Sequence, residues 1–195
     1  MVSNSFVKNF IGTETIDYGF EERWAVLDLI LKKHNKNLPD RTIQYCSQNT
    51  PATYCRNVGR RRRWEISLNK NFTEKDILDE NKIWNFLSKW VTQNDAIIER
   101  KTIYTFKSLI AKKWQEGRVF IAGDAAHLSP PFMGQGMCSG LRDVSNLFWK
   151  LAYCCHSGHK EKLLASYESE RLKNVKEYII TTINMGKLLN SIGDT

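Results

Sequence analysis

One stretch of this sequence constrains the fold more than any other: residues 117–150, GRVFIAGDAAHLSPPFMGQGMCSGLRDVSNLFWK. It begins with a nearly continuous apolar run at 118–123, which is typical of a strand buried on both faces of a parallel sheet. A Pro-Pro loop and a Gly-Gln-Gly turn follow, and then an amphipathic helix at 141–155. This order of strand, loop and helix predicts an α/β unit whose ligand lies beyond the carboxyl end of the strand.

The residues at that strand end suit a polar ligand. Asp124 follows the strand directly, and an ionised carboxylate there can accept hydrogen bonds from sugar hydroxyl groups. Gly134 and Gly136 allow the backbone to approach a flat ligand, and the amides of the next helix start favour partial negative charge on it. The spacing alone is a poor dinucleotide fingerprint, because Ser139 holds the third position and a proline loop precedes the glycines. A tightly packed corner without a ligand explains the same glycines equally well.

The rest of the chain is predicted to add an antiparallel sheet and further helices. Short apolar runs bounded by turn residues indicate strands, and helical periodicity takes over elsewhere. The predicted strands are 23–31, 41–47, 52–58, 62–68 and 102–106, and the predicted helices are 3–11, 73–91, 141–155 and about 160–190. The helix at 141–155 is expected to turn its apolar positions toward the core: Leu141, Val144, Leu147, Phe148 and Leu151.

The positive charge of the chain does not by itself indicate nucleic acid. The 195 residues include 29 Lys+Arg and 21 Asp+Glu, a formal charge of +8, and the run Arg60–Arg63 supplies half of it. No helix-turn-helix, zinc-finger or RNA-recognition pattern accompanies the run. We therefore expect a solvated hairpin tip and no nucleic-acid partner; a phosphate-bearing ligand is the weaker alternative.

The cysteines and the hydropathy of the sequence indicate where the protein is located and whether it binds a metal. No apolar run reaches the roughly 20 residues of a membrane span, so no membrane partner is expected. Five cysteines without a disulfide spacing favour a reducing, cytoplasmic location. Cys154, Cys155, His156 and His159 do not have the spacing of a zinc site, and no metal is expected.

The string GRVFIAGDAAH, followed by PPF, GQG, GLRDVSNLFWKLA and SYESER, resembles the second FAD-binding motif of the class A flavoprotein aromatic hydroxylases. This is the para-hydroxybenzoate hydroxylase superfamily, and the likeness is greatest to 3-(3-hydroxyphenyl)propionate hydroxylases. Residues 18–28, 62–66 and 103–108 also resemble strands of the family's substrate domain. The resemblance implies an α+β fold, with an antiparallel substrate-domain sheet, a remnant of a Rossmann-like FAD-binding domain, and C-terminal helices. It also implies FAD as cofactor, NAD(P)H as reductant, and ortho-hydroxylation of a phenolic acid with O2.

The same resemblance assigns roles to individual residues. Asp124, beside Gly123, would accept hydrogen bonds from ribityl or ribose hydroxyls, and Pro131 would offer its carbonyl to the phenol as the catalytic contact. Backbone facing the pyrimidine end of the flavin would come from Gly134, Gln135, Gly136, Met137 and Cys138. His127 matches the motif, but we expect it to be a packed loop histidine.

The sequence departs from the family near its N-terminus. It has no GxGxxG turn, and MVSNSFVK aligns with an Asp-Gly motif so that Met1 and Val2 replace Asp and Gly and Lys8 replaces an arginine. We therefore expect a chain that is incomplete and inactive alone, with a complementing N-terminal polypeptide as partner; a non-enzymatic remnant with weak or no flavin binding is the alternative. The predicted divisions are a FAD-domain helix remnant at 1–20, the substrate-domain sheet and helix at 21–110, the second FAD motif at 111–155 and the C-terminal helix at 156–195.

Overall fold

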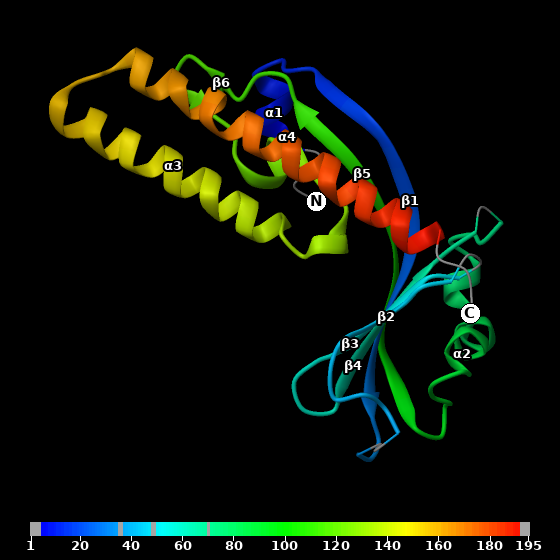
Figure 1. Ribbon diagram of the computed structural model, residues 1–195. Coiled ribbons are helices and arrows are strands. Elements are labelled where there is room, and N and C mark those ends of the chain that lie inside the picture. The colour runs from blue at the N-terminus through cyan, green and yellow to red at the C-terminus, as the bar shows by residue number, and fades with distance from the viewer. Residues whose placement is uncertain (1–4, 35–36, 48–49, 70, 192–195) are drawn as a thin grey trace. The chain divides into compact units, whose positions relative to one another are not determined.

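The computed structural model describes residues 5–34, 37–47, 50–69 and 71–191 of this protein (Figure 1). The chain divides into two compact units. Unit 1 comprises Met1–Glu21 and Phe106–Gly186, and unit 2 comprises Glu22–Thr105 and Lys187–Thr195. None of the helices that the structure describes combines the length and the apolar character that crossing a membrane requires.

The strands of the described residues form a six-stranded sheet and a separate two-stranded one. The order in the larger sheet is β2-β3-β4-β1-β5-β8. Its strands are β1 (Thr15–Leu31), β2 (Ile43–Tyr45), β3 (Ala52–Arg56), β4 (Arg61–Ser67), β5 (Ala96–Ala111) and β8 (His127–Leu128). The pairs β1–β4, β2–β3, β3–β4 and β5–β8 are antiparallel. The predicted α+β class with an antiparallel sheet is therefore confirmed.

Strand β1 begins earlier than the sequence pattern predicts. Gly19, four residues before the strand predicted at 23–31, lies inside β1 with φ at 73°. The backbone amide of Gly19 donates to the Asp17 carboxylate at 2.8 Å, a local contact that is compatible with a bulge in a continuing strand. A glycine within an extended run thus marked an irregularity of the strand and not its end.

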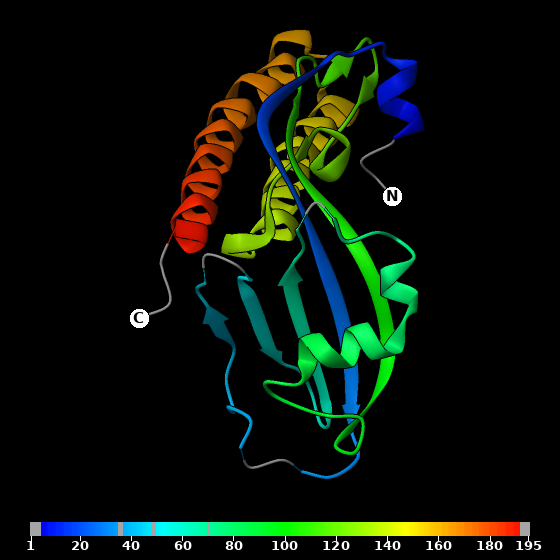
Figure 2. The same ribbon diagram turned by 90° about the vertical axis from the view of Figure 1, so that its right-hand side faces the viewer.

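The core of unit 2 is an apolar layer between its strands and one helix. On β4, Trp64 and Ile66 are buried and alternate with half-buried polar residues, as the period of two predicts. Helix α2 (Glu80–Leu87) covers this layer and buries Ile83 and Leu87 (Figure 2). The arrangement is the ordinary one, in which each element turns its apolar side inward.

The predicted helix at 73–91 is wrong as a single element. Thr73 donates from both its backbone amide and its hydroxyl to Asp76, which starts a short 3-10 turn, η2 (Asp76–Leu78). Asp79 then adopts an extended conformation with ψ at 105°, and its carboxylate accepts from the amide of Asn81. A second capping residue therefore restarts the chain as α2.

The run of four arginines is not a solvated hairpin tip as a whole. Most of it belongs to β4, where the Arg61 guanidinium makes two short contacts with Glu99 and Arg63 pairs with Asp28. Arg62 is 5% exposed and donates to neighbouring backbone carbonyls. The strand register places these side chains alternately on the two faces of the sheet, and carboxylates match two of the four charges, those of Arg61 and Arg63.

Unit 1 begins with helix α1 (Phe6–Phe10), whose N-cap is Ser5. Ser3 and Asn4, the first residues of the helix predicted at 3–11, and the replaced motif positions Met1 and Val2 lie outside the described residues. The predicted strand at 118–123 is shorter than expected: Val119–Phe120 forms β7, which pairs antiparallel with β6 (Gln115–Glu116). Gly117, with φ at 54°, makes the tight turn between them.

Helices α3 (Gly136–Ser157) and α4 (Glu161–Ser191) lie side by side (Figure 1). Hydrogen bonds join residues 143, 146 and 150 of α3 to residues 171, 170 and 166 of α4, respectively, so the two helices run antiparallel. On α4, the buried apolar side chains are Leu164, Tyr167, Val175 and Ile179, which form one face of the helix. The expectation for α3 is confirmed only for Leu147, which is half-buried and packs against the core. The buried side chains of α3 are Ser139, Asp143 and Lys150, whereas Leu141, Val144, Phe148 and Leu151 are exposed.

Candidate functional site

The Gly123–Asp124 turn sits directly on helix α3. It forms the short turn η3 (Gly123–Ala125), and Gly123 has φ at 57°, a conformation that disfavours any other residue. The Gly123 amide donates to the Asp143 carboxylate at 3.0 Å. A Cβ placed on Gly140 would lie 3.4 Å from the Gly123 Cα, so two glycines allow the close approach. Helix α3 thus holds the turn through one hydrogen bond and one backbone contact.

Asp143 is the centre of a buried ionic cluster. Its carboxylate, fully buried, also accepts from His127 Nε2 at 2.6 Å and from Arg171 Nε at 2.8 Å. Burial acts to raise the pKa of Asp143, but the hydrogen bond and charge of His127, the Arg171 guanidinium and the Gly123 amide outweigh it and lower the pKa. The carboxylate is therefore ionised at neutral pH. We call Gly123, His127, Asp143 and Arg171 the Asp143 cluster.

Aromatic side chains enclose this cluster. His127 is 3% exposed and stacks on Trp114, with ring centroids 5.4 Å apart, as expected for a packed histidine. Tyr167 lies next to Trp114 and donates its hydroxyl to the Ile121 carbonyl at 3.0 Å. Both ring systems exclude water from the ion pairs, which strengthens the electrostatic attraction between them.

Asp124 itself takes no part in the Asp143 cluster and remains available. Its side chain is exposed and makes no hydrogen bond or ion pair with any residue in the described part of the chain. It lines a small hollow together with Lys8 and Thr15, and Lys8 Nζ donates to Thr15 Oγ1 at 3.3 Å. A fixed backbone turn thus presents a carboxylate with unused acceptor capacity.

The proline loop after β8 is packed against helix α4. Pro130 is buried, and η4 (Pro131–Met133) follows, in which the Pro131 carbonyl accepts from the Gly134 amide at 2.8 Å. Phe132 contacts Phe20 edge to face at 5.7 Å between centroids, and its ring fills the space that a side chain on Gly186 would need. The Pro131 carbonyl keeps one lone pair for a further donor.

Helix α3 begins without a side-chain cap. Gly134 takes the left-handed conformation with φ at 60°, and the N-cap residue Gln135 makes no capping hydrogen bond, because its amide oxygen accepts from Arg142 instead. The first-turn amides, those of Gly136, Met137 and Cys138, have no acceptor within the helix. The predicted segment 134–138 therefore forms one helix start, and Gly123 touches the same helix one turn later.

The sequence pattern does not predict the role of three residues. It places Asp143 in the helix at 141–155 without a function, and it assigns no role to Lys150 or Arg171. The signal was the spacing of Ser139, Asp143 and Lys150, four and seven residues apart, which marks one helical face. The last helix carries the opposite charges: Glu170 pairs with Lys150, and Arg171 pairs with Asp143.

The cysteine and histidine side chains near the end of α3 are the ones for which the sequence predicts no metal site. In the part of the chain that the structure describes, no three His, Cys, Asp or Glu side chains gather in a way that could hold a metal ion. Cys154, Cys155 and His159 instead line a cavity of about 550 Å³ together with Arg118 and the apolar residues Phe120, Leu151 and Leu164.

Comparison with protein families gives a match over nearly the whole chain. Residues 4–182 match the family model described as an FAD binding domain. This chain belongs to that family of FAD-binding domains. Within it, the sequence belongs with the class A aromatic hydroxylases, as the relatives below indicate.

Two curated relatives illustrate the family. The chain is 37% identical over 188 residues to a probable NADH-specific resorcinol 4-hydroxylase from Rhodococcus jostii, a match that covers 95% of this chain and 34% of the relative. It is 33% identical over 184 residues to a 3-(3-hydroxy-phenyl)propionate/3-hydroxycinnamic acid hydroxylase from Burkholderia cenocepacia, covering 94% of this chain and 33% of the relative. The chain thus spans about a third of the length of the curated relatives it matches.

Solved structures show the same fold. A ternary complex of aklavinone-11 hydroxylase with FAD and aklavinone superimposes with a TM-score of 0.85 at 19% identity, over 99% of this chain and 38% of that one. A p-nitrophenol 4-monooxygenase from Pseudomonas putida gives a TM-score of 0.82 at 18% identity, over 97% and 49% of the two chains. At these identities the likeness concerns the fold alone.

Proposed function

We propose that this chain is the flavin-contacting segment of a monooxygenase that ortho-hydroxylates a phenolic acid with NAD(P)H and O2, and that it works when a complementing N-terminal polypeptide supplies the remainder of the fold. One observation carries the proposal. The Asp143 cluster fixes a turn that presents Asp124 as an exposed carboxylate with unused acceptor capacity. The names of the two curated relatives support a phenolic substrate, and one of them supports NADH as the reductant.

The residues present fit the chemistry of FAD. Asp124 would accept hydrogen bonds from sugar hydroxyls of the cofactor, an interaction for which an ionised carboxylate without competing partners is suited. The amides of Gly136, Met137 and Cys138 at the uncapped start of α3 would lie against the electron-rich edge of the flavin ring. When bound, FAD supplies the redox chemistry that accepts a hydride from NAD(P)H and activates O2.

The protein's own contribution is binding and orientation. The remaining lone pair of the Pro131 carbonyl would accept the hydrogen bond of the phenol hydroxyl and so orient the ring, and the packing of Phe132 on α4 fixes the loop that carries it. No side chain in this loop is assigned as an acid–base catalyst. Catalysis by such a site depends on holding the ring in a reactive orientation and on excluding water.

Five unpaired cysteines support a cytoplasmic location as part of the same proposal, because free thiols persist in a reducing compartment. The second candidate is a non-enzymatic remnant that binds flavin weakly or not at all. This candidate is favoured by the exposed apolar side chains on α3, because such exposure would lower the stability of the isolated chain.

Titration with FAD separates the two candidates. The purified chain, together with its complementing polypeptide, is mixed with FAD, and the visible spectrum is recorded before and after desalting, for the wild type, Asp124→Asn and Glu177→Gln. Loss of a hydrogen bond to a charged acceptor costs about 1.5–3 kcal/mol, so we expect Asp124→Asn to weaken FAD binding by roughly 10- to 100-fold. Glu177→Gln makes the same change of charge at an exposed site of α4 and should bind as the wild type does. A wild-type chain that binds no FAD in the presence of its complementing polypeptide would refute the proposed function.

A further inference from the structure

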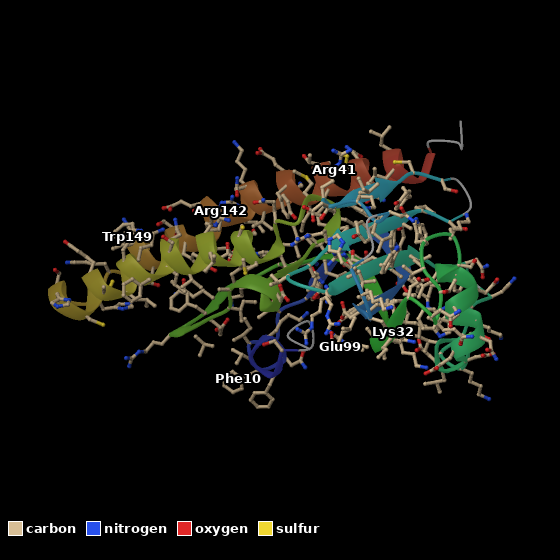
Figure 3. The ribbon with its side chains drawn as sticks, turned by 90° about the horizontal axis from the view of Figure 1, so that it is seen from below. Phe10, Lys32, Arg41, Glu99, Arg142 and Trp149 are labelled. Atoms are coloured by element: carbon tan, nitrogen blue, oxygen red, sulfur yellow. The ribbon has the colours of Figure 1, made fainter. Side chains whose placement is uncertain are left out.

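Helix α3 carries an apolar stripe that nothing in the described part of the chain covers. Its members and their exposed fractions are Met137 (77%), Leu141 (60%), Val144 (54%), Phe148 (69%) and Leu151 (36%). We call these five residues the α3 stripe. Figure 3, which shows the side chains as sticks, labels the exposed Trp149 on the same helix and Phe10 on α1, where Phe6 and Phe10 are 81% and 71% exposed.

The stripe is a single face of the helix and not a scatter of exposed residues. Its members are separated by four, three, four and three residues, the spacing that keeps side chains on one line along a helix. At about 100° per residue, this line lies roughly 140° around the helix from the buried polar face of Ser139, Asp143 and Lys150. The two faces therefore serve different contacts.

The composition of the stripe is that of a buried surface. Over four turns of α3 it contains no charged residue, although α3 carries charges at Arg142, Asp143 and Lys150 on other faces. A solvated helix face is normally polar, and contiguous exposed apolar side chains mark a site of interaction. The polar face is already used by α4, so the stripe is free for another partner.

The lengths of the relatives identify the kind of partner. This chain corresponds to about a third of each curated relative, so most of a family chain lies outside the match. The start of α3 also carries the candidate flavin site, and Met137 belongs both to that site and to the stripe. A polypeptide that covers the stripe would therefore also reach the candidate flavin site at the start of α3.

We propose that the α3 stripe is the docking surface for the complementing polypeptide, one that carries the remainder of a family chain and meets the stripe with an apolar face. This inference rests on the proposed function, because that function supplies the partner. A second copy of this chain fits less well. Five side chains on one helix are far fewer than the roughly 20–30 residues per partner of a stable interface, whereas a larger polypeptide can also cover α1 and the cavity beside Phe120.

The test uses variants matched for chemistry on the same helix. The chain is co-expressed with the N-terminal part of the Rhodococcus resorcinol hydroxylase, up to the start of its match, and co-elution is measured by gel filtration. Phe148→Glu places a charge in the stripe, and Tyr153→Glu makes an equivalent change at a residue that is 49% exposed outside it. We expect Phe148→Glu to weaken the complex at least 100-fold and Tyr153→Glu to change it less than threefold. Circular dichroism should show equal helix content, because both residues are exposed.

Three results would overturn the inference: equal co-elution of both variants, no co-elution of the wild type, or self-association of the wild-type chain that Phe148→Glu abolishes. The last would make a second copy the partner. FAD titration of the same samples distinguishes the two proposals. Asp124-dependent FAD binding with an unaffected Phe148→Glu complex refutes only the docking surface. A Phe148-dependent complex without FAD binding refutes only the proposed function.

Discussion

Helices α2 and α3 use their two faces in opposite ways. In unit 2, α2 buries Ile83 and Leu87 against the strands and leaves its polar side chains in water. In unit 1, α3 buries Asp143 and Lys150 and exposes the α3 stripe. Both helices are amphipathic in sequence. A periodic pattern therefore identifies two faces of a helix, whereas the partners available in the fold decide which face is covered.

The polar side chains between α3 and α4 are paired with one another. Lys150 Nζ, fully buried, donates to Ser166 at 2.7 Å and pairs with Glu170 at 2.9 Å. Asn146 also donates to Glu170 at 2.7 Å, and these donors, Asn146 foremost, lower the pKa of Glu170 to about 2. Buried charges are costly unless each has a partner, so these contacts define one register of the two helices.

The largest expected effect is the loss of the Asp143 cluster. In Asp143→Ala, Arg171 is left buried without its carboxylate, and breaking a buried ion pair in this way destabilises a protein by about 3–5 kcal/mol. Urea unfolding should show this loss, and hydrogen exchange should place it in unit 1. Ser145→Ala, an exposed position on the same helix, should change the free energy of unfolding by less than about 0.5 kcal/mol. A loss below about 1 kcal/mol for Asp143→Ala would mean that α3 is not held by its polar face.

Truncating one leucine on α2 and one on α3 tests whether the apolar face of each helix is buried. Leu87 on α2 is fully buried, and Leu87→Ala should cost about 2–5 kcal/mol because it leaves a cavity in unit 2. Leu141 on α3 is 60% exposed, and Leu141→Ala should alter the free energy of unfolding by less than about 0.5 kcal/mol in the purified chain. Thermal and urea unfolding of both variants measure this difference. Equal losses would show that the α3 stripe is covered in solution.

A single methyl group tests the packing of the proline loop. In Gly186→Ala the new Cβ would clash with the ring of Phe132, and overpacking of this kind costs about 1–3 kcal/mol despite the better helix propensity of alanine. Lys187→Ala, at the next and exposed position, should be nearly neutral. If Gly186→Ala were stabilising instead, Phe132 would be free to move, and the Pro131 carbonyl would not be fixed as proposed.

The sequence predicted elements better than it predicted partners. The alternation around Trp64 and the period of α4 were enough to place strands and a helix, because local residues determine those patterns. The stripe on α3 has the pattern of a core face, but that reading requires elements outside the local pattern to cover it. The apolar run at 118–123 does pack into the core, yet it forms a much shorter strand than its length predicts. Asp143 was missed for a related reason, since its partners His127 and Arg171 are 16 and 28 residues away in the chain.

The smallest effect concerns pH and again distinguishes the two faces of α3. The pKa of Asp143 is lower in the folded chain than its unfolded value of about 3.9, so the cluster stabilises the fold above about pH 4 and loses that contribution as the pH falls through the folded pKa. Urea unfolding between pH 7 and pH 2.5 should therefore show a steeper acid loss for the wild type than for Asp143→Asn, in which the group cannot titrate. Exposed carboxylates titrate equally in both proteins, and the difference isolates Asp143. Parallel curves would show that the carboxylate gains no net stabilisation from its buried partners, and the Gly123–Asp124 turn would then owe its position to the glycine contact alone.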